Sequence, residues 1–175
     1  MTRAEIRARA LAQAGEQESA LGEMSGVVNQ YLDEGQRMLY PCGVCASVQV
    51  TVTDGAGGLG GGVLDVVRVK NASGGEETRY AIEDGCLRGL ADGTYDLLAL
   101  KEPEGMLADT TECALPAGVQ GALADYATWR ILSGGGRTQQ LRADFYWQRF
   151  LIERQRAQRV QEQRMGPRRR VNRYR

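Results

Sequence analysis

Six residues near position 55 match a nucleotide-binding motif letter by letter. Gly55, Gly57 and Gly60 reproduce the G-x-G-x-x-G pattern that cradles the pyrophosphate of a dinucleotide. That chemistry requires the motif to open a helix, because the helix N-terminus meets the phosphate groups. Here two more glycines follow and lead into the β-rich stretch 63–67, and the lysine and Ser/Thr of a P-loop are missing. The sequence therefore predicts a mobile glycine loop at a hairpin tip, which is available for docking to a partner.

Cys42 and Cys45 have the spacing of half a zinc site or of a redox dithiol. A zinc site needs two further ligands, and only the isolated Cys86 and Cys113 remain in a chain without histidine. A thioredoxin-like dithiol follows a strand and opens a helix, whereas this pair follows a helical pattern and precedes a strand pattern. We therefore expect buried, reduced cysteines and no metal site.

No group of residues has the make-up of a catalytic centre. Histidine, the commonest general acid or base, is absent. Carboxylates are frequent in the predicted turns and loops, where solvation explains them, and there is no nucleophile elbow. These carboxylates include Glu76, Glu77, Glu83, Asp84, Glu102 and Glu104. We expect no catalytic residue and no cofactor, and we expect that the protein is not an enzyme.

The charge is balanced overall but unevenly distributed along the chain. The 22 basic residues equal the 22 acidic ones, yet residues 137–175 hold twelve arginines against three acidic residues, a net charge of +9. The preceding residues therefore carry −9. Arginine offers a planar fork that binds carboxylates or phosphates and stacks on aromatic rings, so it favours fixed contacts over mere solubility. The partner is either protein carboxylates or nucleic acid, because both present oxyanions. The alternative is that the arginines bind no partner and form a solvated helix face.

Two helices are predicted before residue 45. Thr2 and Glu5 form a capping-box pattern, and Gly15 can close the helix in the left-handed conformation. A second helix begins between residues 19 and 25, carries apolar residues at three- and four-residue steps over 28–39, and stops at Tyr40-Pro41.

The middle of the chain changes to the alternating pattern of strands. Val48, Val50 and Val52 alternate with polar residues, which is typical of a half-buried strand. Further strands are predicted at 63–70, 79–82, 86–90, 95–100 and 110–115, with Asp-Gly turns between some of them. Residues 46–115 are thus predicted to form an inserted small antiparallel β barrel or sandwich.

Two more helices close the predicted fold. Pro116 starts one that ends at the glycines 134–136, and Thr138 caps the last. Its first half is expected to pack on the other helices through the bulky residues Leu141, Phe145, Tyr146, Phe150 and Ile152. Beyond Glu153 the helix becomes polar, which predicts projection into solvent or contact with another molecule, and Gly166-Pro167 breaks it.

The resulting fold class is α+β: an antiparallel-like four-helix bundle with the inserted β module and an extended basic C-terminal helix and tail. The predicted divisions are 1–45 for two bundle helices, 46–115 for the insert, 116–152 for the other two helices and 153–175 for the arginine-rich extension. No run approaches the roughly 18 apolar residues of a membrane span, and residues 1–11 do not resemble a signal peptide. We expect a protein without a membrane partner in a reducing cytosol.

Three segments carry a likeness to a known family. They are VVNQYLDEGQR at 27–37, ALADYATWR at 122–130, preceded by Leu115-Pro116, and ADFYWQRF at 143–150. In these patterns and in its order of elements, the chain resembles the head-to-tail connector (adaptor, or head-completion) proteins of tailed double-stranded DNA phages. The resemblance implies a four-helix subunit of a homo-oligomeric, typically dodecameric ring, bound beneath the portal ring after DNA packaging.

The resemblance also implies partners and contact residues. The C-terminal extension would bind the portal protein, the insert would meet a tail or nozzle protein, and DNA would pass through the lumen of the ring. The protein would then be made in the host cytoplasm and reside at the head–tail junction of the virion. The expected tail-side contacts are Gly57, Gly58, Leu59 and Gly60. The expected portal contacts are Arg154, Arg156, Arg159, Arg164, Arg168, Arg169, Arg170, Arg173, Tyr174 and Arg175.

Two other functions compete with this interpretation. The first is a nucleic-acid-binding protein whose arginine-rich C-terminus neutralises phosphates, which would show steep salt dependence. The second is a small enzyme that binds a nucleotide at the glycine motif.

Overall fold

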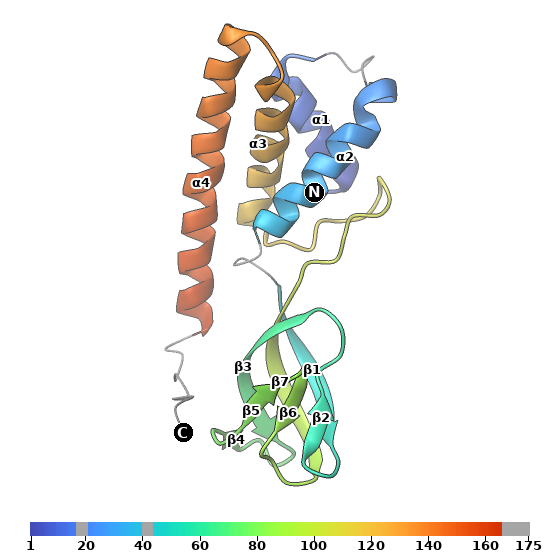
Figure 1. Cartoon of the computed structure of the whole chain (residues 1–175), viewed down its shortest axis with the longest axis vertical. Coiled ribbons are helices and arrows are strands. Elements are labelled where there is room, and N and C mark those ends of the chain that lie inside the picture. The colour runs from blue at the N-terminus through green and yellow to red at the C-terminus, as the bar shows by residue number, and fades with distance from the viewer. Residues whose placement is uncertain (17–20, 40–43, 166–175) are drawn as a thin grey trace. The chain divides into compact units, whose positions relative to one another are not determined.

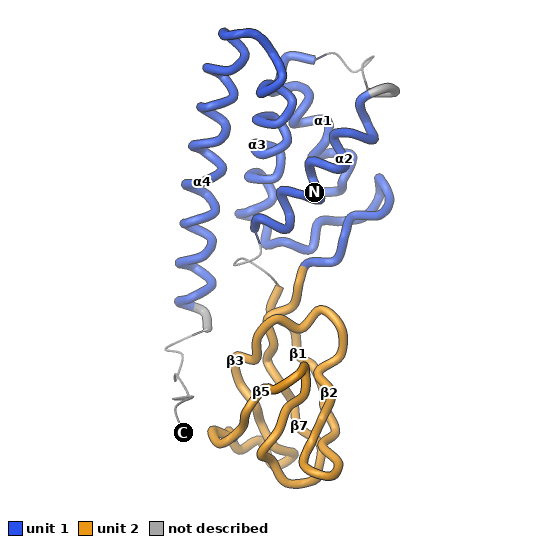
Figure 2. The backbone as a smooth tube through the Cα atoms, in the orientation of Figure 1, with its two compact units in different colours: residues 1–42, 103–166 blue, residues 43–102, 167–175 orange. Residues whose placement is uncertain are grey.

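A computed structural model describes residues 1–16, 21–39 and 44–165, and it divides the chain into two compact units (Figure 2). A helical unit contains the described residues of 1–42 and 103–166, and a β unit contains those of 43–102. The expected helix stop at Tyr40-Pro41, the break at Gly166-Pro167 and the tail after it lie outside the described residues.

The helical unit contains α1 (Arg3–Ala14), α2 (Leu21–Met38), α3 (Ala117–Ser133) and α4 (Arg137–Met165) (Figure 1). The predicted caps of α1 are confirmed: Thr2 and Glu5 form a reciprocal capping box, and Gly15 adopts a φ of 84°. At α4, however, Thr138 is not the cap. The helix begins one residue earlier, and the Gln139 side chain accepts a hydrogen bond from the Gly136 amide at 3.1 Å.

Helix α3 is the centre of the helical unit. It is apolar on nearly all sides, since Asp125 and Arg130 are its only charged residues, and it packs against each of the other three helices. The core includes Ile6 of α1, Leu32 of α2 and Phe150 of α4, all fully buried. The expected four-helix bundle is therefore wrong: three helices pack around a central one, because an all-round apolar helix must be covered on every side.

The β unit contains two antiparallel sheets. The four-stranded sheet has the order β1-β7-β3-β4, and the three-stranded sheet has the order β2-β6-β5. The strands are β1 (Val44–Val52), β2 (Ala56–Gly58), β3 (Val63–Asn71), β4 (Glu76–Glu77), β5 (Ala81–Glu83), β6 (Cys86–Arg88) and β7 (Gly93–Lys101). Residues of both sheets share one core, which contains Val50, Val69, Leu87 and Leu97.

The predicted alternation in β1 is confirmed, because Val50 and Val52 are buried while the polar residues between the valines face solvent. The predicted closed barrel is wrong. Neither sheet closes on itself, since β1 and β4 are the edges of the larger sheet, and the very short β4 leaves most of β3 uncovered on that side.

The strand expected at 110–115 is also absent. That segment forms only an isolated bridge between Thr2 and Glu112, and it belongs to the helical unit. Met106, Cys113 and Leu115 are buried in the helical core, which explains why an apolar stretch here does not join a sheet.

Across the three described ranges, no helix combines the length and apolar character needed to cross a bilayer.

Candidate partner-binding surfaces

Helix α4 is held on α3 by a cluster of aromatic rings. The ring centroids of Trp147 and Trp129 lie 4.4 Å apart, and those of Phe150 and Tyr126 lie 5.2 Å apart. The residues of α4 that face the core recur at heptad-like steps, at Ala143, Trp147, Phe150 and Ala157. This spacing commits one face of α4 to α3 and leaves the opposite face uncovered within the helical unit.

Leu141, Phe145 and Ile152 form that opposite face and are named here the α4 stripe. Their exposed fractions are 67%, 58% and 57%. Steps of four and seven residues place all three on one side of the helix. The prediction that these three residues pack against the other helices is therefore wrong, and of the expected set only Phe150 is fully buried. An exposed apolar stripe on the side of a helix that faces away from the core is typical of a docking surface.

The structure describes the side chains of three of the predicted portal contacts. Arg156 is largely exposed and pairs with Glu153 at 3.0 Å, Arg159 is exposed, and Arg154 is half-buried. Arg164 lies in the last turn of α4. The other predicted contacts lie outside the described residues: Arg168, Arg169, Arg170, Arg173, Tyr174 and Arg175.

A cavity of about 360 Å³ lies between α1, α3 and α4. Its lining includes Arg9, Gly121, Asp125 and Arg149, and Ile152 of the α4 stripe also borders it. Asp125 is buried and is bound on both oxygens, by Arg149 Nη2 at 3.2 Å and by Gln13 Nε2 at 3.2 Å. Burial raises the pKa of Asp125, although Arg149 and Gln13 oppose that shift. With both oxygens occupied, Asp125 ties three helices together, which is a structural role.

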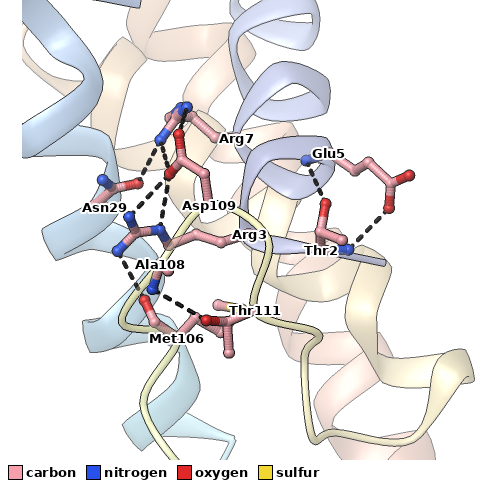
Figure 3. Close-up of polar contacts among 9 residues, drawn as sticks. All are labelled: Thr2, Arg3, Glu5, Arg7, Asn29, Met106, Ala108, Asp109 and Thr111. Atoms are coloured by element: carbon pink, nitrogen blue, oxygen red, sulfur yellow. Dashed lines mark hydrogen bonds and ion pairs between the residues drawn. The ribbon is translucent and has the colours of Figure 1, made fainter.

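Residues 103–112, named here the Leu107 loop, follow the β unit in the chain and are held on the helical unit by a network of polar contacts with α1 (Figure 3). Arg3 Nη1 donates to the carbonyl of Met106 at 2.7 Å, and both Arg3 and Arg7 form ion pairs with Asp109. Gln36 of α2 donates to the carbonyl of Glu104 at 3.1 Å. The loop is thus fixed to α1 and α2, while the Leu107 side chain is 89% exposed.

Asp109 makes the stability of the loop depend on pH. Hydrogen bonds from Arg7 and Arg3 hold the pKa of Asp109 well below its usual range. As the pH falls, the Asp109 carboxylate is therefore protonated in the unfolded chain before it is protonated in the folded chain. The ion pairs stabilise the fold above about pH 4, and this stabilisation is lost as the pH falls further.

We expect Asp109→Asn to lower the urea midpoint at pH 7. The difference in midpoint between the variant and the wild-type protein, called here the gap, should shrink as the pH falls from about 4 to about 2.5. Urea unfolding at several pH values measures this gap. Glu104→Gln is the control, because only its backbone carbonyl is used in the loop network. A gap for Asp109→Asn that stays constant across this pH range would contradict the assigned role.

The glycine motif does not form the mobile loop that its composition predicts. Gly57 and Gly58 lie in β2, which pairs with β6, and Leu59 is buried with its amide bonded to the Gly85 carbonyl at 3.0 Å. Gly60, at a φ of 76°, belongs to the turn into β3 rather than to a helix. Of the four predicted tail-side contacts, only Gly58 and Gly60 are exposed.

The structure describes three of the four cysteines. Cys45 is exposed at the start of β1, Cys86 is half-buried in β6 and Cys113 is buried in the helical core. The burial predicted for Cys45 is therefore wrong, and Cys42 lies outside the described residues. In the part of the chain that the structure describes, no group of three metal-ligating side chains is found.

Sequence reasoning missed the exposed α4 stripe and the exposed Leu107 loop. The signal for the α4 stripe was available, because Leu141, Phe145 and Ile152 share a helical face opposite to that of Phe150. The Leu107 loop had no such signal, since its partners Arg3 and Arg7 are more than 100 residues away.

Comparison with known proteins adds nothing to these surfaces: no family model matches the sequence, and no curated protein matches it.

Proposed function

We propose that this protein is a structural head-to-tail adaptor of a tailed double-stranded DNA phage. Copies of the helical unit form a ring, typically twelvefold, beneath the portal ring and around the DNA path. Helix α4 and the arginines that follow it bind the portal protein, while the β unit meets a tail or nozzle protein. The protein then resides at the head–tail junction and closes the packaged head.

The observation that carries this proposal is the concentration of arginine at one end of an anchored helix. Helix α4 contains seven arginines against three acidic residues, and five more arginines follow residue 165. The aromatic cluster on α3 fixes the first half of α4, which gives a rigid base to its second half, where Arg154 and Arg164 precede the five arginines after residue 165. Guanidinium groups suit a partner rich in carboxylates, because each can form two charge-assisted hydrogen bonds.

The test is removal of residues 166–175 from the full chain. We expect attachment to portal rings encoded by the same genome to weaken by about a hundredfold or more, because the deletion removes five arginines. Co-sedimentation with the rings measures attachment, and circular dichroism checks that the fold remains. Attachment that is unchanged by the deletion would refute the proposal.

A matched pair of variants separates hydrogen-bond geometry from charge. Arg168, Arg169 and Arg170 are replaced together by lysine in one variant and by glutamine in another. If bidentate contacts dominate, both variants lose attachment; if charge alone is required, only the glutamine variant does.

The competing function is nucleic-acid binding, which the same arginines favour. It predicts affinity for random DNA or RNA that falls steeply with salt, together with no affinity for portal rings. Binding to random DNA and to portal rings, each measured at about 50 and about 200 mM salt, therefore distinguishes the two functions.

A further inference from the structure

The Leu107 loop presents an apolar side chain from a rigid support. Met106 is 1% exposed and anchors the loop in the helical core, while its neighbour Leu107 is 89% exposed. Arg3 and Arg7 hold the Met106 carbonyl and the Asp109 carboxylate (Figure 3). On the other side of Leu107, Gln36 holds the carbonyl of Glu104. A side chain that is held out by a fixed loop loses little conformational freedom when a partner covers it, so binding through it is favoured.

The Leu107 loop and the α4 stripe lie in surroundings of opposite charge. The Leu107 loop contains Glu104, Asp109 and Glu112 and no lysine or arginine. Glu104 and Glu112 are exposed, and their carboxylates form no ion pair among the described residues. Helix α4 instead carries the excess of arginine, and Arg156 and Arg159 are exposed near the α4 stripe. The two surfaces are therefore complementary in charge, and both are apolar at their centres.

The two surfaces lie on different sides of the helical unit. Helix α4 packs chiefly against α3, whereas the Leu107 loop is bonded to α1 and α2 (Figure 1). One copy therefore presents both surfaces at once. A contact between two different surfaces is heterologous, and its repetition builds a ring when the rotation between copies closes.

We propose that the Leu107 loop of one copy docks on the α4 stripe of a second copy of this chain. Leu107 then packs on Phe145 and Ile152, and the carboxylates of Glu104 and Glu112 face the exposed arginines of α4. This inference rests on the ring in the proposed function and assigns the surfaces that build it.

The first experiment measures self-association of the full chain by sedimentation equilibrium. We expect the wild-type protein to form species larger than a monomer. Leu107→Ser and Ile152→Ser should each weaken association by about tenfold or more, because each removes apolar area from the contact. The control is Val27→Ser, since Val27 is an exposed apolar residue of α2 that belongs to neither surface. All the substituted side chains are exposed, and circular dichroism checks that each variant remains folded.

The second experiment tests whether the contact is heterologous. Leu107→Asp removes the loop's apolar group, and Phe145→Asp places a carboxylate in the α4 stripe, so each variant alone should be monomeric. Mixed one to one, the intact α4 stripe of the first variant can bind the intact loop of the second. We expect a one-to-one pair that grows no further, which native mass spectrometry detects.

Three results would overturn the inference: a wild-type protein that stays monomeric at every concentration, association unaffected by the Leu107 and Ile152 variants, or mixed variants that do not pair. None of these readouts involves a portal. A wild-type ring that assembles through these surfaces but binds no portal would remove the proposed function and leave this inference standing.

Discussion

Replacement of Phe150 by alanine lowers the free energy of unfolding by about 3–5 kcal/mol. Phe150 is fully buried, and its ring centroid lies 5.2 Å from that of Tyr126 and 5.5 Å from that of Trp147. Alanine would leave a cavity where α4 packs on α3, because rings on both helices are fixed by several neighbours and cannot close the space. Urea unfolding followed by tryptophan fluorescence measures the loss, since Trp129 and Trp147 are the chain's two tryptophans and both belong to this cluster.

The control for this prediction is the only other phenylalanine of the chain. Phe145 also lies on α4, but 58% of it is exposed. Phe145→Ala should change the free energy of unfolding by no more than about 0.5 kcal/mol. Equal losses for the two variants would mean that Phe150 is not the anchor of α4.

Gly57→Ala should destabilise the β unit by about 1–3 kcal/mol, despite the small size of the added group. A Cβ at position 57 would lie 2.6 Å from Val50 Cγ1 and 3.0 Å from the carbonyl oxygen of Thr51. Val50 is buried in the core of the unit, and the Thr51 carbonyl belongs to the backbone of β1, so neither can move away freely. Hydrogen exchange of the β1 and β7 amides, followed by mass spectrometry, measures the loss of protection.

Gly58 provides the matched control in the same short strand. Apart from its two neighbours in the chain, no residue has an atom within 4 Å of the Cβ that alanine would place at position 58, and the φ of Gly58 is not in the left-handed region. Gly58→Ala should therefore change stability by no more than about 0.5 kcal/mol. If both variants lost the same protection, close packing would not explain the glycine at position 57. The contrast also gives the motif a structural meaning, because at least one of its glycines is required by packing rather than by a phosphate.

Several features of the fold follow from local sequence and were predicted correctly. The capping box at Thr2 and Glu5, the left-handed Gly15 and the alternation that ends in Val50 and Val52 all involve residues within a few positions of one another. Short-range hydrogen bonds and side-chain periodicity act within one turn of helix or one strand, so a single stretch of sequence contains the information.

The roles of other residues were settled by parts of the chain far away in sequence. The glycine motif resembles a loop in composition, but pairing with β6 makes Ala56–Gly58 a strand. The stretch 110–115 resembles a strand, but the helical core buries Cys113 and Leu115 instead. In both cases contact with an element far away in the sequence overrides the local pattern.

For the candidate surfaces too, some properties follow from the sequence and others depend on the fold. The excess of arginine after residue 137, the absence of histidine and a long last helix could all be predicted from the amino-acid sequence. Three further features are visible only in the folded protein: the face of α4 that meets α3, the exposure of Leu141, Phe145 and Ile152, and the support of the Leu107 loop by Arg3 and Arg7. Composition is a property of the chain alone, whereas exposure depends on what covers a residue, and here the covering or supporting groups come from other elements of the fold.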